Sequence, residues 1–222
     1  ASIYIAILSP LKESNHLMKL VLFFYLLFLP VLCKAQPYLP KEGDIVFQTS
    51  RSTQSAAVQA ATASPYSHMG IVLFQKGKPY VFEAVQPVKF TELGQWLARG
   101  KAGHFVAKRL KSSLNAKEVG KLYVYARRYV GKPYDLTFEW SDERIYCSEL
   151  VWKLYKQAAN VELAPLEKLG SFNLKAPVVR KKLTERYGAN IPLKEPVISP
   201  VAIFNSPLLL TIAKHGVAPR IQ

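Results

Sequence analysis

One cysteine of this sequence stands where a nucleophile could be activated. Cys147 begins a run, from residue 147 to about 160, in which apolar residues recur at helical spacing. Unpaired backbone N–H groups and the positive end of a helix dipole favour a thiolate at such a position. The same position also suits a small buried hydrophobe, because the sulfur lies on the apolar side of the helix. The position alone therefore leaves a reactive and an inert thiol open.

A reactive thiol needs a base, which in turn needs an orienting group. After residue 35 the sequence has three histidines, His68, His104 and His215. His68 begins a predicted strand, and a four-residue hairpin loop over residues 75–78 would place Glu83 diagonal to it on the same face. A loop one residue longer or shorter would place His68 and Glu83 on opposite faces of the sheet. Glu83 interrupts an apolar run and needs a partner there, for which an imidazole is suited. Cys147, His68 and Glu83 are therefore the candidate nucleophile, base and orienting acid.

The elements that must position these residues follow from the pattern along the chain. Strands are predicted at residues 43–48, 69–74, 80–85 and 104–110. Helices are predicted at residues 52–62, 115–130 and 147–160, the second opened by a capping box of Asn115 and Glu118. From Ala164 onward we expect mostly loops, with a helix at most over residues 176–187. Since no regular βαβ alternation occurs, the pattern predicts an α+β domain built on an antiparallel sheet packed against helices.

The N-terminal region predicts export. Residues 20–33 are strongly apolar but too short for a membrane span, and they follow Lys19 as the core of a signal peptide does. We predict upstream sequence at 1–17, a signal peptide at 18–35 and a single domain at 36–222. An acylated Cys33 is the alternative, but Leu32 is not the small residue that a lipoprotein signal requires. We therefore expect a periplasmic or secreted protein whose remaining cysteine is Cys147.

Composition and charge exclude several classes of protein and indicate the kind of partner. Half of the 222 residues are hydrophobic, which excludes a disordered chain. Two cysteines cannot form a four-thiolate zinc site, and we expect neither a metal nor a cofactor. Removal of residues 1–35 takes away Lys12, Lys19, Lys34 and Glu13, so the formal charge falls from +15 to +13. For an exported protein we expect this positive charge to attract anionic polymers or lipid headgroups rather than nucleic acid.

Five blocks in this order resemble the YiiX-type permuted NlpC cysteine hydrolases. The blocks are residues 43–47 (GDIVF), 67–72 (SHMGIV), 81–84 (VFEA), 131–135 (GKPYD) and 146–151 (YCSELV). The resemblance covers roughly residues 40 to 160, and residues 200–208 (PVAIFNSPL) are similar to the family's ending. It implies a papain-like domain in which the histidine and acidic strands precede the cysteine helix. By this resemblance Cys147 is the nucleophile, His68 the base and Glu83 the third member of a triad.

The first hypothesis is an exported cysteine hydrolase that cleaves a peptide or isopeptide bond of the cell wall through a thioester. Tyr66, Tyr134 and Tyr146 are candidate substrate-binding residues because they adjoin the candidate catalytic residues in sequence. One alternative is a lipid acyl hydrolase or acyltransferase that uses the same cysteine. Another is a catalytically silent cationic module that binds the cell envelope. The sequence does not decide between hydrolysis and acyl transfer, nor does it give the oligomeric state.

Overall fold

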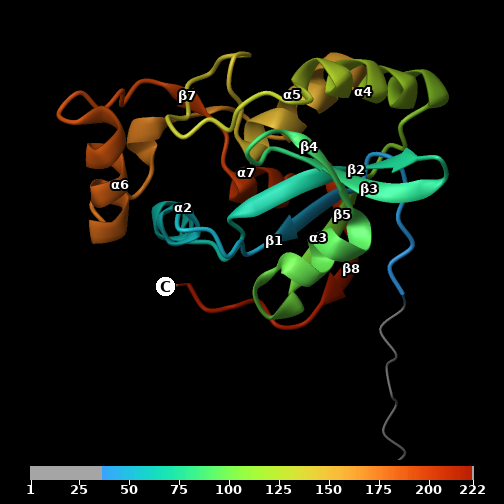
Figure 1. The fold of residues 1–222 in the computed structure, drawn as a ribbon, viewed down its shortest axis with the longest axis horizontal. Coiled ribbons are helices and arrows are strands. Elements are labelled where there is room, and N and C mark those ends of the chain that lie inside the picture. Colours follow the sequence, from blue (N-terminus) through green and yellow to red (C-terminus); the bar gives the residue numbers. More distant parts are fainter. Residues whose placement is uncertain (1–36, 222) are drawn as a thin grey trace, which may run out of the picture. The chain divides into compact units, whose positions relative to one another are not determined.

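The centre of the structure is one antiparallel sheet with the spatial order β4-β3-β2-β1-β5-β8 (Figure 1). The computed structural model describes residues 37–221, so the predicted signal peptide and Cys33 lie outside the described residues. The strands are β1 (Ile45–Gln48), β2 (His68–Gln75), β3 (Lys78–Glu83), β4 (Lys89–Glu92), β5 (Phe105–Leu110) and β8 (Leu209–His215). Every neighbouring pair is antiparallel, which agrees with the predicted α+β class.

Two long helices, α4 (Ala116–Tyr129) and α5 (Cys147–Ala159), lie together at the top of Figure 1. The capping box predicted for α4 is present, because the Asn115 side chain accepts from Glu118 N at 3.0 Å and Glu118 Oε2 accepts from Asn115 N at 2.8 Å. The shorter helices are α2 (Ser55–Thr62), α3 (Leu93–Arg99), α6 (Pro177–Tyr187) and α7 (Pro200–Phe204), with 3₁₀ turns at Lys101–Gly103 and Leu169–Ser171. Within residues 37–221, no helix is both long and apolar enough to cross a membrane.

The two faces of the sheet bury different sets of side chains. Along β1, Ile45 and Phe47 join the large core that contains Leu150 and Leu154 of α5. Val46 lies on the opposite face and packs with Trp96 of α3. This alternation is what a strand produces when both of its faces are covered. Helix α5, which begins at Cys147, therefore covers one face of the sheet and α3 covers the other.

The β2–β3 hairpin sets the position of the candidate base and acid. Its register pairs Phe74 with Pro79, as a loop over residues 75–78 requires, but the strands also pair Gln75 with Lys78. The loop is therefore a two-residue turn rather than the predicted four-residue one, and its Lys76 and Gly77 both have positive φ, 50° and 77°. At Gly70 a Cβ atom would clash with Val81 and lie 2.9 Å from the Phe82 carbonyl oxygen. Glycine at that position therefore allows β3, and with it Glu83, to lie close against β2.

The region after Ala164 is more ordered than the sequence predicted. The helix expected over residues 176–187 is present as α6, but the expectation of loops elsewhere was wrong for α7, β8 and the small pair β6 (Glu167–Lys168) and β7 (Pro196–Val197). The strand β8 pairs with β5 at the edge of the sheet, where only Leu209 of its seven residues is buried, so the strand has no clear hydrophobic alternation. Figure 1 shows α6 beside α2, and these helices share a small apolar cluster that includes Ala57, Val179 and Leu183.

Candidate active site

Cys147 is the first residue of α5, as the sequence predicted, and it is only 4% exposed. The side chains of the two neighbouring residues, Tyr146 and Ser148, both form hydrogen bonds with the backbone of Ile198. Tyr146 accepts a hydrogen bond at its hydroxyl from Ile198 N at 3.1 Å, and the Ser148 hydroxyl donates to Ile198 O at 2.7 Å. The start of α5 is thus fastened to the segment that follows β7, which fixes the direction of the thiol.

His68 is the first residue of β2 and lies between Glu83 and Cys147. Its Nε2 is 2.6 Å from Glu83 Oε2, so the two side chains share a face as the hairpin register predicted. The ring also interacts with Cys147, whose hydrogen bond and negative charge both act on the His68 pKa. The structure therefore brings the three candidate catalytic residues together in the order Glu83, His68, Cys147.

Glu83 is fully buried and accepts four hydrogen bonds from side chains. Besides His68, Oε2 accepts from Trp96 Nε1 at 2.8 Å and from Arg99 Nη2 at 2.5 Å, while Oε1 accepts from Thr91 Oγ1 at 2.6 Å. Thr91 belongs to β4, and the other two donors stand three residues apart on α3. Sequence reasoning missed these donors, and the spacing of Trp96 and Arg99 on one helix face is the signal that could have suggested them.

The charges of these groups stabilise one another. Burial is the largest influence on the His68 pKa and lowers it, but the hydrogen bonds and negative charges of Cys147 and Glu83 raise it to about 9. Burial likewise raises the pKa of Glu83, but its bonds to His68 and Thr91 and the charges of His68 and Arg99 lower it to about 2. At neutral pH the arrangement therefore favours an imidazolium at His68 beside an ionised Glu83.

A second glutamate is buried near the thiol on α5. Glu149 is also 0% exposed, and its Oε1 lies 2.8 Å from Lys153 Nζ. Its Oε2 accepts a long bond of 3.4 Å from the backbone N of Tyr146. Burial raises the pKa of Glu149 to about 8, because the hydrogen bond and charge of Lys153 offset only part of the desolvation.

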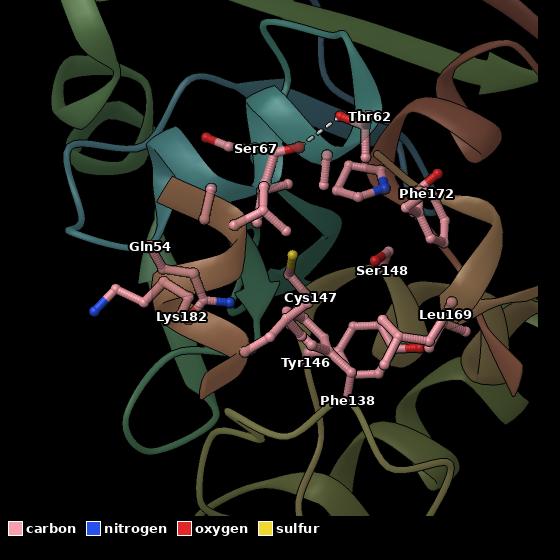
Figure 2. Close-up of a pocket in the computed structure, with 18 of the residues that line it drawn as sticks. Gln54, Thr62, Ser67, Phe138, Tyr146, Cys147, Ser148, Leu169, Phe172 and Lys182 are labelled. Carbon is pink, nitrogen blue, oxygen red and sulfur yellow. Dashed lines mark hydrogen bonds between the residues drawn. The ribbon is translucent and has the colours of Figure 1, made fainter. Parts of the chain in front are cut away.

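The sulfur of Cys147 points into a cavity of about 90 Å³ that is lined mostly by apolar side chains (Figure 2). Residues of α2, α6 and α5 enclose it. A wider groove of about 490 Å³ contains His68. The cavity and the groove share Gln54, Ser67 and Tyr134, which lie between the thiol side and the imidazole side. A substrate could therefore lie with one part in the cavity, its reacting carbonyl between Cys147 and His68, and the rest in the groove.

The three predicted substrate-binding tyrosines have different positions. Tyr134 lines both the cavity and the groove, and burial followed by the negative charge of Cys147 raises its pKa well above the usual range, so its hydroxyl stays neutral. Tyr146 lines the cavity. Tyr66 is not among the residues lining either space, because its buried ring stacks on Phe204 at 4.1 Å between centroids.

The other two histidines lie apart from the thiol. His104 is fully buried at the start of β5, where its Nδ1 is 2.7 Å from the backbone oxygen of His215 in β8. Of the three histidines after residue 35, His68 alone lines the groove beside Cys147.

A family model described as "permuted papain-like amidase enzyme, YaeF/YiiX, C92 family" matches residues 39–213. The chain belongs to this family. The resemblance inferred from the sequence and the predicted fold class are thereby confirmed, and the protein is a cysteine hydrolase of the amidase or peptidase type. The catalytically silent binding module is therefore not retained.

Two relatives of this C92 family member support the assignment. The uncharacterized protein YiiX of Escherichia coli K12 is 50% identical over 190 residues, which are 86% of this chain and 94% of the relative. The crystal structure of YiiX from E. coli O157:H7 has 52% sequence identity and a TM-score of 0.77, covering 80% of this chain and 99% of the other. That structure is described as a metalloprotein. In the part of this chain that the structure describes, no group of three or more His, Cys, Asp or Glu side chains could hold a metal ion.

Proposed function

We propose that the protein cleaves an amide bond through a thioester on Cys147, with His68 as the proton carrier and Glu83 as the group that orients it. The observation that carries this proposal is the connected line from Glu83 Oε2, 2.6 Å from His68 Nε2, through the imidazole to the thiol at the start of α5. Nucleophile, base and orienting acid in hydrogen-bonding contact are the arrangement that acyl transfer by cysteine requires.

The reaction begins with attack of the Cys147 thiolate on the substrate carbonyl, which forms the S–C bond. The backbone N–H of Cys147, unpaired at the helix start, stabilises the oxyanion. When the C–N bond breaks, the imidazolium of His68 gives its proton to the leaving amine. His68 then takes a proton from water, whose oxygen attacks the thioester, and the carboxylic acid leaves as Cys147 is regenerated. The raised pKa of His68, about 9, keeps the proton available for the first transfer at neutral pH.

The proposed substrate is a peptide or isopeptide bond of the cell wall. The groove beside His68 contains polar side chains such as Ser50, Arg51 and Gln86, which suit an extended peptide. The formal charge of +15, or +13 without residues 1–35, attracts the protein to anionic polymers and lipid headgroups of the envelope.

The apolar lining of the cavity supports a second candidate substrate, the acyl group of a lipid. Side chains such as Ala57, Val58, Leu169 and Leu183 line the space next to the thiol. The same thioester chemistry would then release or transfer a fatty acyl group. The groups that become attached to Cys147 distinguish these candidates.

We also propose that residues 18–35 are removed on export. The proposal rests on the apolar stretch after Lys19 and the small residues before Gln36. N-terminal sequencing of protein recovered from the periplasm or medium should begin at Gln36. A lipid-modified N-terminus at Cys33 would instead establish the lipoprotein alternative.

Mass spectrometry of the protein after incubation with envelope extract tests the proposed function. A stalled acyl adduct on Cys147 should appear in the wild type, and its mass should match a peptide fragment. Cys147→Ala should carry no adduct and turn over no substrate, with a melting curve close to that of the wild type. A fatty acyl adduct would favour the lipid candidate. An unmodified thiol together with undiminished turnover by Cys147→Ala would contradict both.

A further inference from the structure

The positively charged side chain of Arg186 lines the largely apolar cavity beside Cys147. Arg186, in the last turn of α6, lines the cavity that contains Cys147 and is only partly exposed. Its guanidinium lies over the Phe138 ring at 5.2 Å from the centroid. Its Nη2 donates to Gln54 Oε1 at 3.0 Å. The planar donor group is thus held by an aromatic ring and an amide, so its orientation is fixed.

The charge of Arg186 lacks a close counterion. Among residues 37–221, no carboxylate oxygen lies within 4.0 Å of it, whereas Lys182, which lines the same cavity, is paired with Glu185 at 2.7 Å. Asp135 acts on Arg186 from beyond that distance; its Oδ1 accepts from the Thr137 backbone and hydroxyl at 2.7 Å, and its buried Oδ2 has no hydrogen-bond partner among the described residues. A partly desolvated cation without a paired anion is costly unless a ligand supplies the anion.

A short chain of contacts connects Arg186 to the thiol. Gln54, which accepts from Arg186, has its Nε2 3.5 Å from the Tyr134 hydroxyl. Cys147 raises the pKa of Tyr134 and Arg186 lowers it, so both groups lie close enough to act on the Tyr134 hydroxyl. The guanidinium is therefore separated from the nucleophile by little more than these two side chains, at the place where the cavity meets the groove.

We propose that Arg186 binds a free carboxylate of the substrate, so that the enzyme prefers amide substrates in which the part held by the apolar cavity bears that carboxylate. This inference rests on the proposed function, since it specifies the substrate class of the same site. A guanidinium offers a fork of N–H donors that matches the two oxygens of a carboxylate, and Gln54 occupies only part of it. Apolar walls around the ion pair exclude water and strengthen it.

Alkylation of Cys147 by two reagents of similar size provides the test. Iodoacetate carries a carboxylate where iodoacetamide carries a neutral amide, so the ratio of their rate constants reports on recognition of negative charge beside the sulfur. His68 raises this ratio in every variant that retains it, and comparison between variants removes that contribution. Arg186→Gln should lower the ratio about tenfold, the scale of one charge-assisted hydrogen bond.

Arg180→Gln is the matched control, because Arg180 is an exposed arginine on the same helix and is not among the residues lining the cavity. It removes the same net charge and should leave the ratio close to that of the wild type. An unchanged ratio in Arg186→Gln, or an equal fall in both variants, would overturn the proposal. Arg186→Lys should retain part of the preference, since it keeps the charge but loses the fork.

A binding measurement separates this inference from the proposed function. Butyrate and butyramide are titrated against Cys147→Ser, which has no thiol at this position, with ligand-observed NMR as the readout. We expect butyrate to bind more tightly, and we expect Arg186→Gln in the same background to abolish the difference. Equal binding of the two ligands contradicts the carboxylate site even if Cys147 is catalytic. Preferential butyrate binding supports the site even if the wild-type thiol proves unreactive.

Discussion

Glu83 and Glu149 are both fully buried and both belong to the surroundings of Cys147, yet their pKa values move in opposite directions. The pKa of Glu83 falls to about 2 and that of Glu149 rises to about 8. Four side-chain donors contact Glu83, whereas Glu149 has one lysine and one long backbone bond. Burial raises the pKa of both, so the number and geometry of donors decide the outcome.

The difference assigns two tasks to two carboxyl groups. The region of β3, β4 and α3 keeps Glu83 ionised, and an ionised Glu83 keeps His68 protonated and correctly turned. The start of α5 leaves Glu149 largely protonated at neutral pH, so Glu149 adds little negative charge beside Cys147. Cys147 therefore faces the ionised Glu83 across the imidazole of His68 and the largely protonated Glu149 along α5.

Removing the charge of Glu83 should produce the largest effect. Glu83→Gln leaves His68 without its anionic partner, and we expect turnover to fall by about 10³- to 10⁴-fold, the scale seen when a catalytic histidine loses its carboxylate. Initial rates on the substrate identified by adduct mass spectrometry measure the loss. Glu149→Gln is the matched control and should retain turnover within about threefold, since the amide resembles the protonated acid. Equal losses in both variants would remove the distinction between the two glutamates.

The dependence of stability on pH should also separate them. The folded pKa of Glu149, about 8, exceeds its usual value of 4.5, so its contribution to stability is present below about pH 4.5 and is lost as the pH rises to 8. Glu149→Gln should therefore gain stability relative to the wild type across this window, by a few kcal/mol, because each tenfold change in proton affinity corresponds to about 1.4 kcal/mol. Glu83 has the opposite sign, because its contribution is present above about pH 4.5 and is lost as the pH falls to 2. Urea unfolding at several pH values measures both, and a constant difference between wild type and Glu149→Gln contradicts the assignment.

A smaller effect is expected from one donor to Glu83. Trp96→Phe keeps an aromatic ring near His68 but removes the bond from Nε1 to Oε2, which is 2.8 Å long. Hydrogen bonds to charged groups contribute about 1.5 to 3 kcal/mol, so we expect that loss in the free energy of unfolding at pH 7. The other donors keep Glu83 ionised at pH 7, so the His68 pKa should not fall. A fall in that pKa would show that Glu83 loses its charge without Trp96.

The smallest effect on stability should come from Tyr146, at the start of α5 and away from the donors to Glu83. Tyr146→Phe removes the hydroxyl that accepts from Ile198 N at 3.1 Å, and it leaves the charges of both glutamates in place. An unpaired buried N–H costs about 1 to 3 kcal/mol. We expect a loss near the lower end in the free energy of unfolding, with the His68 pKa unchanged. A shift of that pKa would show that the two sides are coupled.

Local signals predicted part of this arrangement. The apolar spacing after Cys147 indicated its helix. The predicted loop over residues 75–78 has the same parity as the observed turn at 76–77, so it correctly put His68 and Glu83 on one face. The capping box of Asn115 marked the start of α4. Each of these features depends on residues close together in the chain, so the pattern alone determines them.

The remaining features depend on contacts between distant segments. Thr91, Trp96 and Arg99 lie on a four-residue strand and a seven-residue helix that has no side-chain cap, so neither element has a strong local signal. Arg186 reaches the site because α6 packs on α2, far from it in sequence. Tyr66 illustrates the converse, since it adjoins His68 along the chain but its ring stacks on Phe204.

The central claim is that Glu83 and Cys147 hold His68 as an imidazolium, and NMR titration of the His68 ring protons tests it most directly. In the wild type the ring should titrate with a pKa of about 9, and Glu83→Gln should lower that value, whereas Glu149→Gln should not. A wild-type His68 that titrates near its usual 6.5 and does not respond to Glu83→Gln would contradict the account.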